Sequence, residues 1–159
     1  MSDIIRTKRT YLREIDLTDA EDIVKWRSDP EVFKFFKNPH KISLEEHLNW
    51  FNNNYMLDTT RHDWICISAD SQKKLGVFGI VEDRTDVEIN YLLSPEAQKQ
   101  GYAIEVLSAL IDHVRENCHA GEVIAEIHKD NFPSIKVVQK LGFALKETKG
   151  EFNIYSLEL

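Results

Sequence analysis

Six consecutive residues have the composition of an anion-binding turn: Gln98, Lys99, Gln100, Gly101, Tyr102 and Ala103. An apolar-rich stretch, Val87 to Leu93, precedes them, and apolar residues at helical spacing follow from Gly101 to Asn117. The first N–H groups of a helix have no intrahelical acceptor and lie at the positive end of its dipole, so a strand, turn and helix start can bind pyrophosphate. Gly101 has no Cβ, which lets a ligand approach the backbone closely. An ordinary strand–helix connection would explain the same residues.

A second segment, Asn131 to Phe143, has clear helix start and stop signals. Asn131 can cap a helix, and Pro133 suits the first turn. Gly142 suits the left-handed residue just past the end. We therefore expect a second helix that begins near Asn131 and ends before Gly142.

The other elements follow from periodicity and turn residues. Strands are expected at 10–16, 62–69, 75–82, 87–93, 122–129, 143–149 and 151–159. Capping-box patterns at Thr18–Glu21 and Ser43–Glu46 predict two early helices. The predicted order is β-αα-βββ-α-β-α-ββ, an α/β domain that spans residues 1–159. It has a mixed central sheet of about seven strands and four helices.

This order and the two motifs resemble the GNAT superfamily of acyl-CoA-dependent N-acetyltransferases. Gln98, Gly101 and Ala103 match its acetyl-CoA motif, Gln/Arg-x-x-Gly-x-Gly/Ala. Its later signature is matched by Asn131, Ser134, Gly142 and Phe143. The resemblance implies the GNAT fold and acetyl-CoA as the acetyl donor. It places the 98–103 turn and Asn131 against the donor, although capping and, for Lys99, simple exposure to solvent are alternative explanations.

Amide formation from an amine and a thioester requires a base, because an amine with a pKa of ~7.7–10.4 arrives as ammonium. Glu88 and Asn90 share one face of their strand, and Ile89 and Tyr91 share the other. By resemblance, Glu88 is the candidate base, directly or through water; a solvated edge carboxylate is the alternative.

The oxyanion needs hydrogen-bond donors, whereas a thiol with a pKa of ~8.5 is already a fair leaving group. The resemblance assigns the oxyanion contact to the main chain at Leu92 and Leu93. Many relatives carry a tyrosine acid seven residues after the motif asparagine, where this chain has Val138. Ser134 is the candidate substitute, as in the branch that acetylates ribosomal-protein N-termini; a local backbone hydrogen bond would explain it equally.

The early helical region resembles the nucleotide-sugar N-acetyltransferases of the pseudaminic-acid pathway, which act on a UDP-linked 4-amino-4,6-dideoxy sugar. The resemblance rests on Trp26-Arg27 and on Ile-x-x-Glu-Glu-His-Leu from Ile42 to Leu48. Arginine pairs with phosphate, and aromatic rings stack on uracil or a sugar. The predicted acceptor-binding residues are Trp26, Arg27, His47, Trp50 and Tyr91. Packing in the helix core is the alternative for the tryptophans.

Two other functions stay open. Leu12-Arg13 and Asp29 to Val32 equally resemble the ribosomal-protein N-terminal acetyltransferases. A GNAT fold that binds acyl-CoA without turnover is the third possibility, favoured only by Val138.

The composition narrows the class of partner. The formal charge of −7 argues against nucleic acid and anionic membrane surfaces, and no apolar run approaches a membrane span. Cys66 and Cys118 lack metal-ligand spacing, as do the histidines, so no metal is expected. Two unpatterned cysteines and no secretory segment predict a cytoplasmic protein. A homodimer is compatible with the sequence, which does not determine the oligomeric state.

Overall fold

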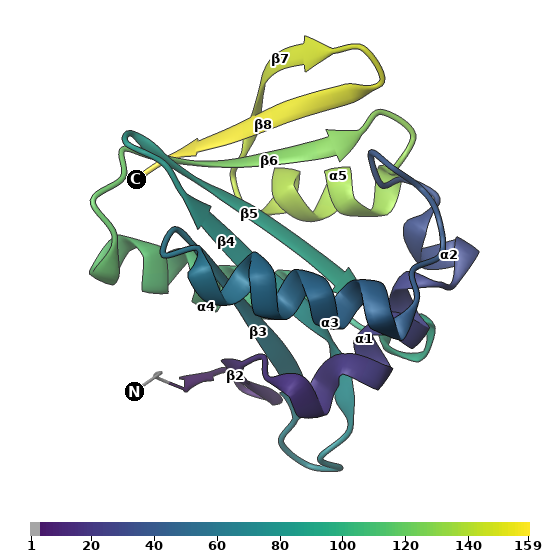
Figure 1. Ribbon diagram of the computed structural model, residues 1–159. Helices are drawn as coiled ribbons and strands as arrows, with labels where there is room; N and C mark the ends of the chain where they lie inside the picture. Colours follow the sequence, from purple (N-terminus) through teal and green to yellow (C-terminus); the bar gives the residue numbers. More distant parts are fainter. Residues whose placement is uncertain (1–3) are drawn as a thin grey trace.

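The computed structural model describes residues 4–159 and contains a mixed eight-stranded sheet in the order β1-β2-β3-β4-β5-β6-β8-β7 (Figure 1). The strands are β1 Ile5–Arg6, β2 Thr10–Glu14, β3 Arg61–Ser68, β4 Lys74–Glu82, β5 Asp86–Leu93, β6 Glu122–His128, β7 Ala144–Lys149 and β8 Phe152–Glu158. Neighbouring strands are antiparallel except β5 and β6, which are parallel. The mixed α/β fold that the sequence predicts is confirmed.

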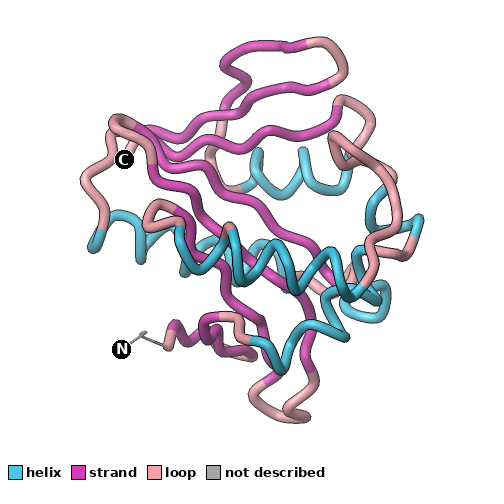
Figure 2. Tube along the Cα trace, viewed as in Figure 1, coloured by secondary structure: helices cyan, strands magenta, loops and turns pink. Residues whose placement is uncertain are grey.

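The described residues form five α-helices, and helices pack on both faces of the sheet (Figure 2). They are α1 Ala20–Arg27, α2 Pro30–Phe33, α3 Leu44–Asn53, α4 Tyr102–Asn117 and α5 Phe132–Lys140, with short 3-10 helices η1 Leu17–Asp19, η2 Tyr55–Leu57 and η3 Pro95–Ala97. One core cluster joins α1 and α3 to the sheet through Ile65, Ile67 and Val77. The larger cluster joins α4 and α5 to the opposite face. The sheet therefore separates two helical layers.

The longest helix, α4, lies where its apolar stripe predicts. Val106, Leu107, Leu110 and Val114 recur at helical spacing and are fully buried against the sheet. Complete burial of one such side chain stabilises the fold by about 1.5–3 kcal/mol. This packing fixes the start of α4, at Gly101, relative to the end of β5.

The parallel pair β5–β6 is joined over only a short length. The paired residues are Asp86–Glu122, Val87–Val123 and Glu88–Ile124. Beyond Glu88 the strands diverge, as Figure 1 shows, although β5 continues to Leu93 and β6 to His128. The divergence opens a space in the middle of the sheet, beside the N-termini of α4 and α5.

Some local predictions need correction. The expected capping box at Thr18 and Glu21 is wrong: Asp16 accepts a hydrogen bond from the Thr18 amide, and the Asp19 side chain accepts one from the Asp16 amide. The carboxylates two residues earlier cap the preceding 3-10 helix, η1, and the first strand ends at Glu14, earlier than expected. The Ser43–Glu46 capping box is confirmed.

Two short elements add to the predicted count. β1 contains two residues, too few for a recognisable alternation. α2 is a single turn with Asp29 as N-cap and Pro30 in its first turn. Within residues 4–159, no helix is long and apolar enough to cross a membrane.

Candidate functional site

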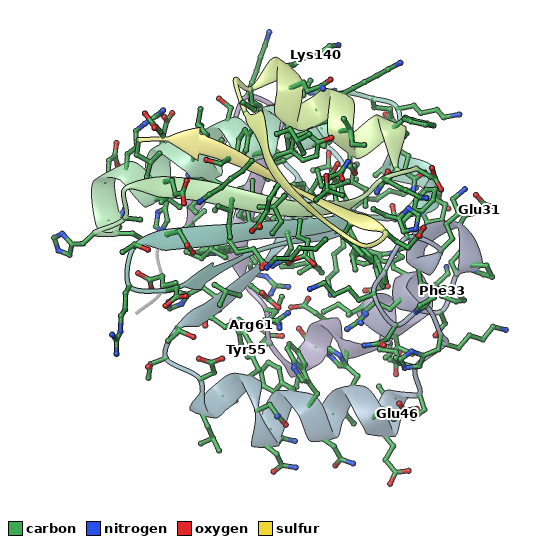
Figure 3. All side chains as sticks on the ribbon, turned by 90° about the horizontal axis from the view of Figure 1, so that it is seen from above. Glu31, Phe33, Glu46, Tyr55, Arg61 and Lys140 are labelled. Atoms are coloured by element: carbon green, nitrogen blue, oxygen red, sulfur yellow. The ribbon has the colours of Figure 1, made fainter. Side chains whose placement is uncertain are left out.

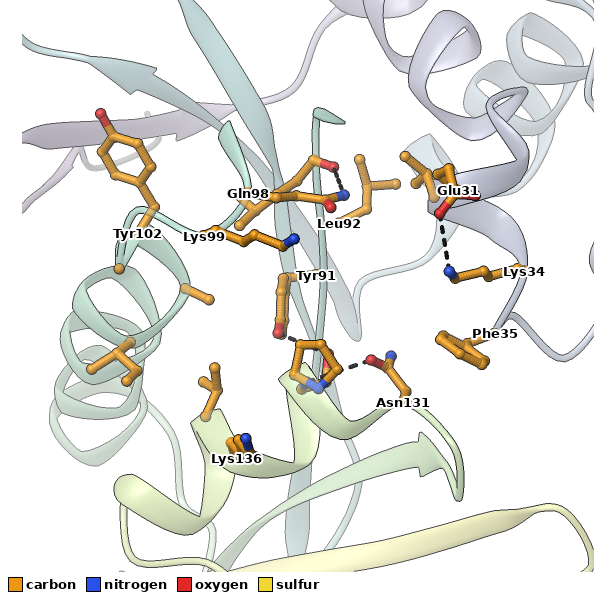
Figure 4. A pocket seen from close by; sticks show the side chains of 18 of the residues that line it. Glu31, Lys34, Phe35, Tyr91, Leu92, Gln98, Lys99, Tyr102, Asn131 and Lys136 are labelled. Atoms are coloured by element: carbon orange, nitrogen blue, oxygen red, sulfur yellow. Dashed lines mark hydrogen bonds and ion pairs between the residues drawn. The ribbon is translucent and has the colours of Figure 1, made fainter. Parts of the chain in front are cut away.

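A cavity of about 650 Å³ lies where β5 diverges from β6 (Figure 4). Four segments line it: the end of β5, the turn into α4, the first turns of α5, and α2 with the loop after it. The lining residues include Tyr91, Leu92, Leu93, Gln98, Lys99, Gly101, Tyr102, Ala103, Asn131, Ser134, Lys136 and Lys140. The segments that the sequence singles out as donor-binding thus meet in one place.

The turn into α4 has the backbone of an anion-binding loop. Gly101 is the N-cap of α4 and has a φ of 80°, in the left-handed region that favours glycine. Lys99 also has a positive φ, 62°. The amide of Glu105 donates to the Gly101 carbonyl, which leaves the preceding first-turn amides without an intrahelical acceptor. Gln100 lies outside the cavity lining, and its Nε2 donates to the Glu96 carbonyl over 2.6 Å.

Arg9, in the turn between β1 and β2, contributes to this site. The sequence did not indicate this contribution. Arg9 Nε donates to Glu105 Oε1 over 2.7 Å, and its guanidinium lies 4.2 Å from the centre of the Tyr102 ring. A Cβ added to Gly101 would lie 3.5 Å from Arg9 Nη2. The turn therefore brings a positive charge beside the start of α4.

Two hydroxyl groups meet at the start of α5. Asn131 caps the helix by accepting a hydrogen bond from the Ser134 amide at 3.4 Å. The Ser134 hydroxyl lies 2.9 Å from the Tyr91 hydroxyl, and the Tyr91 ring stacks on Phe78 with centroids 5.3 Å apart. Tyr91 thus lies on the face of the sheet that packs against α4 and α5.

The orientation of the last β5 peptides follows from a close approach to β4. A Cβ on Gly76 would lie 2.2 Å from the Leu92 carbonyl oxygen, so that carbonyl faces β4. Alternation along the strand then directs the amide and carbonyl of Leu93 toward the opening. Gln98 Nε2 donates to this carbonyl over 3.4 Å.

Glu88 does not line the cavity. Its side chain lies on the face of β5 opposite to that of Tyr91, and on the same side of the sheet as Glu126 of β6. Burial, and then the Glu126 carboxylate, raise the pKa of Glu88, whereas the Lys37 ammonium opposes this shift. Lys37 Nζ lies 2.5 Å from Glu126 Oε1, so the loop after α2 reaches these carboxylates.

On the same face, Arg61 pairs with the buried carboxylate of Asp63, and Arg27 interacts with it through charge. Arg61 Nη2 lies 3.2 Å from Asp63 Oδ2, and Asp63 is 3% exposed. Burial and the nearby Arg61 lower the pKa of Arg27, whereas Asp63 opposes the shift. Figure 3 shows Arg61 between the sheet and α3. Neither Arg61 nor Asp63 was predicted from the sequence, although a charged pair at the start of an apolar strand is a signal that could have indicated them.

The two predicted tryptophans pack with the smaller core cluster on this face, Trp26 as a buried member and Trp50 as a partly buried neighbour. The Arg61 guanidinium lies 5.0 Å from the Trp50 ring centre, and the His47 and Trp50 rings are 5.5 Å apart. His47 is 3% exposed, and its Nδ1 has no hydrogen-bond partner among the described residues. Trp26, 6% exposed, packs in the smaller core cluster, as the packing alternative expects.

The cavity between the end of β5 and the starts of α4 and α5, named the donor cavity for the acetyl donor, fits a pantetheine chain with phosphates at one end. It has a strand edge, a helix N-terminus with free amides, and lysines at 99, 136 and 140 around its rim. A phosphate at the Gly101 turn would meet the free amides, and Lys99 lies two residues before that glycine. Within residues 4–159, no cluster of metal-ligating side chains is found.

Comparisons with known proteins agree with this geometry. Residues 9–144 match the model of the acetyltransferase (GNAT) domain. The chain is 28% identical over 140 residues to the uncharacterised N-acetyltransferase YnaD of Bacillus subtilis, covering 87% of this chain and 81% of the relative. It is 24% identical over 141 residues to the acetyltransferase PseH of Campylobacter jejuni, covering 87% and 85%.

A solved structure shows the same fold. The ribosomal L7/L12 alpha-N-protein acetyltransferase RimL in complex with coenzyme A aligns with a TM-score of 0.83 at 19% identity, covering 99% of this chain and 98% of RimL. The family match covers most of the chain, and the donor cavity has the features that coenzyme A requires. The chain therefore belongs to the GNAT acetyltransferase family and is an acetyl-CoA-dependent N-acetyltransferase.

Proposed function

We propose that the acceptor is a UDP-linked 4-amino-4,6-dideoxy sugar, bound over the face of the sheet that carries Glu88 and Asn90. The observation that carries this proposal is the pair of guanidinium groups, Arg27 and Arg61, near one buried carboxylate, Asp63. Because two cations lie near a single anion, the partly buried region around Asp63 has an excess positive charge. A diphosphate supplies the missing negative charge and matches the planar fork of arginine.

The aromatic rings beside the two arginines suit the uracil and sugar groups of such an acceptor. Trp50 lies against the Arg61 guanidinium, and the His47 ring is 5.5 Å from the Trp50 ring. Burial, followed by the charge of Arg27, lowers the pKa of His47, which favours the neutral ring. This neutral ring is 3% exposed, and its Nδ1 has no hydrogen-bond partner among the described residues. Uracil and sugar faces stack on rings such as Trp50.

The amine would reach the donor through the gap between β5 and β6. Glu88 marks the point where these strands separate, so its carboxylate is the proposed proton acceptor, directly or through water. The Leu93 amide, directed into the opening, is the preferred donor to the carbonyl of the bound acetyl group. Ser134 is the proposed proton donor to the departing sulfur, because it lines the cavity on the other side of the sheet.

The test compares acceptors in wild type and in Arg27→Ala. The variant should raise the KM for the UDP-amino sugar about ten- to a hundredfold, because it loses a charge-assisted contact of about 1.5–3 kcal/mol. The KM for acetyl-CoA should stay nearly constant, since Arg27 does not line the donor cavity. Lys25→Ala is the matched control: it removes a positive charge from an exposed position of the same helix.

The same experiment separates the sugar from a protein N-terminus. UDP alone should inhibit the wild-type enzyme and change its tryptophan fluorescence. Efficient acetylation of Ala- or Ser-starting peptides, without any effect of UDP, would contradict the sugar proposal and favour protein N-terminal acetylation.

A further inference from the structure

The hydrogen-bonded hydroxyls of Tyr91 and Ser134 come from two elements that line the donor cavity, and a dashed line at Tyr91 in Figure 4 marks their bond. Tyr91 lies on β5, which also carries the proposed oxyanion donor, and Ser134 lies in the first turn of α5. We propose that Tyr91 supplies, through the Ser134 hydroxyl, the proton that the sulfur of coenzyme A takes up when the thioester is cleaved. This inference rests on the proposed position of Ser134 at the departing sulfur.

The number of protons in the pair supports this arrangement. Each hydroxyl has one proton, and the hydrogen bond between them, 2.9 Å long, uses only one of the two. Among the described residues, it is the only hydrogen bond found for either hydroxyl oxygen. One O–H group is therefore left to donate into the cavity. A phenol is the stronger acid, so Tyr91 donates to Ser134, and Ser134 directs its own proton outward.

The proton and the electron pair each have a defined destination. Ser134 gives its proton to sulfur as the C–S bond breaks and sulfur keeps the electron pair, while the acceptor nitrogen forms the new C–N bond. Tyr91 passes its proton to Ser134, so the negative charge comes to rest on a phenolate rather than on an alkoxide. The nitrogen loses two protons to Glu88 or to water, one from the ammonium before attack and one after the C–N bond has formed. Water then returns a proton to Tyr91, and the net reaction releases one proton.

Tyrosine suits this task better than serine alone. A phenol has a pKa of ~10, within about two units of a thiol at ~8.5, whereas an aliphatic alcohol is far less acidic. Burial raises the pKa of Tyr91, and its hydrogen bond with Ser134 partly offsets the shift. The phenol is therefore protonated at neutral pH and ready to donate.

The surroundings explain why the strand supplies this hydroxyl. Val138 occupies the helix position where many relatives carry a tyrosine, and it is 1% exposed within the core cluster. The Tyr91 ring stacks almost parallel on Phe78, at an interplanar angle of 11°, which holds its hydroxyl at Ser134. The tyrosine hydroxyl thus reaches the cavity from β5 instead of from α5.

Tyr91→Phe tests the proposal, since it keeps the stacked ring and removes only the hydroxyl. We expect kcat to fall about tenfold, less than the ~10²–10⁴ of a typical general acid because a thiolate leaves readily. Ser134→Ala should lose a similar factor, and the double variant should lose little more, because the two hydroxyls act in series. Tyr11→Phe, which removes a hydroxyl that bonds Gln72 far from the cavity, should match wild type.

A binding measurement provides a readout independent of turnover. Calorimetry should show that wild type binds coenzyme A more tightly than its desulfo analogue, because the hydroxyl pair donates toward sulfur. Both single variants should lose this preference and keep the affinity for the analogue.

Each contrary outcome identifies what fails. Wild-type rates in Tyr91→Phe with a slow Ser134→Ala would overturn the role of Tyr91 and leave that of Ser134. Wild-type rates in both would overturn both roles. Additive losses, or a Tyr91→Phe that weakens binding of the two ligands equally, would show separate or merely structural contributions and overturn the relay.

Discussion

Glu88 has a different acidity from that of an exposed glutamate. Burial contributes most to its raised pKa, the Glu126 carboxylate adds to it, and the Lys37 ammonium limits it. A general base works only when deprotonated, so a raised pKa moves the acidic limb of a pH–rate profile upward. The neighbours of Glu88 are therefore expected to influence the pH range in which the enzyme is active.

Glu88→Gln should slow turnover and shift activity to higher pH, where more of the amine is already free. Glu126→Gln is the matched comparison: without the neighbouring negative charge, the pKa of Glu88 should fall and the acidic limb should move to lower pH. Initial rates across a pH series measure both effects. Unchanged profiles in both variants would assign Glu88 to a solvated strand edge.

The turn between β5 and α4 is proposed to bind phosphate through its backbone amides, so we expect the shape of the turn to matter more than its side chains. Gly101 and Gly150 both have positive φ, 80° and 59°. Gly101 lies in the donor cavity, whereas a Cβ at Gly150 would have no atom within 4 Å. The two glycines thus share the same conformational requirement and differ in their distance from the proposed ligand.

Gly101→Val should weaken coenzyme A binding strongly, because its Cβ would lie where phosphate meets the amides. Gly150→Val should leave the affinity unchanged, although both variants adopt a left-handed conformation that costs about 1–2 kcal/mol. Calorimetry measures the affinity, and coenzyme A should raise the melting temperature of wild type and of Gly150→Val. Equal affinities in a folded Gly101→Val would contradict phosphate binding at this turn.

Asp19 connects distant parts of the molecule. Its side chain is fully buried and accepts hydrogen bonds from both terminal nitrogens of Arg13 on β2, each 2.8 Å long. Lys74 Nζ of β4 lies 2.7 Å from the same carboxylate. Burial raises the pKa of Asp19, but the hydrogen bonds from Arg13 and Lys74 outweigh it, so the net shift is downward.

Asp19→Asn should therefore destabilise the whole fold by about 3 kcal/mol, the low end for breaking a buried pair because Arg13 is partly exposed. Asp112→Asn, in an exposed pair with Arg115, should cost no more than about 1 kcal/mol. Urea unfolding at neutral pH measures both. A small effect at Asp19 would show that solvent compensates for the lost charge.

The lowered pKa of Asp19 also determines how the stability of the fold changes with pH. A lowered pKa means that the stabilisation is present above the unfolded-state pKa, about 3.9 for aspartate. It is lost as the pH falls through the folded-state pKa. Asp19→Asn should therefore show a flatter decline of stability in acid than wild type.

The sequence by itself determined the features that depend on local backbone geometry. Gly101 and Gly142 were recognisable because only glycine adopts positive φ easily, and Asn131 because a cap precedes its helix directly. The shared face of Glu88 and Asn90 follows from the period of a strand. These local signals, in their order, predicted the fold class, and their resemblance to the GNAT motifs implied the acetyl donor.

The tertiary structure decided which distant residues meet. Arg61 joins Arg27 at Asp63, and Tyr91 meets Ser134, only because long-range strand pairing and helix packing bring separate segments together. No local pattern records where β5 leaves β6, yet this divergence creates the donor cavity. Periodicity also leaves open which aromatic residue of a helix is buried, and packing alone placed Trp26 in the core and Trp50 beside Arg61.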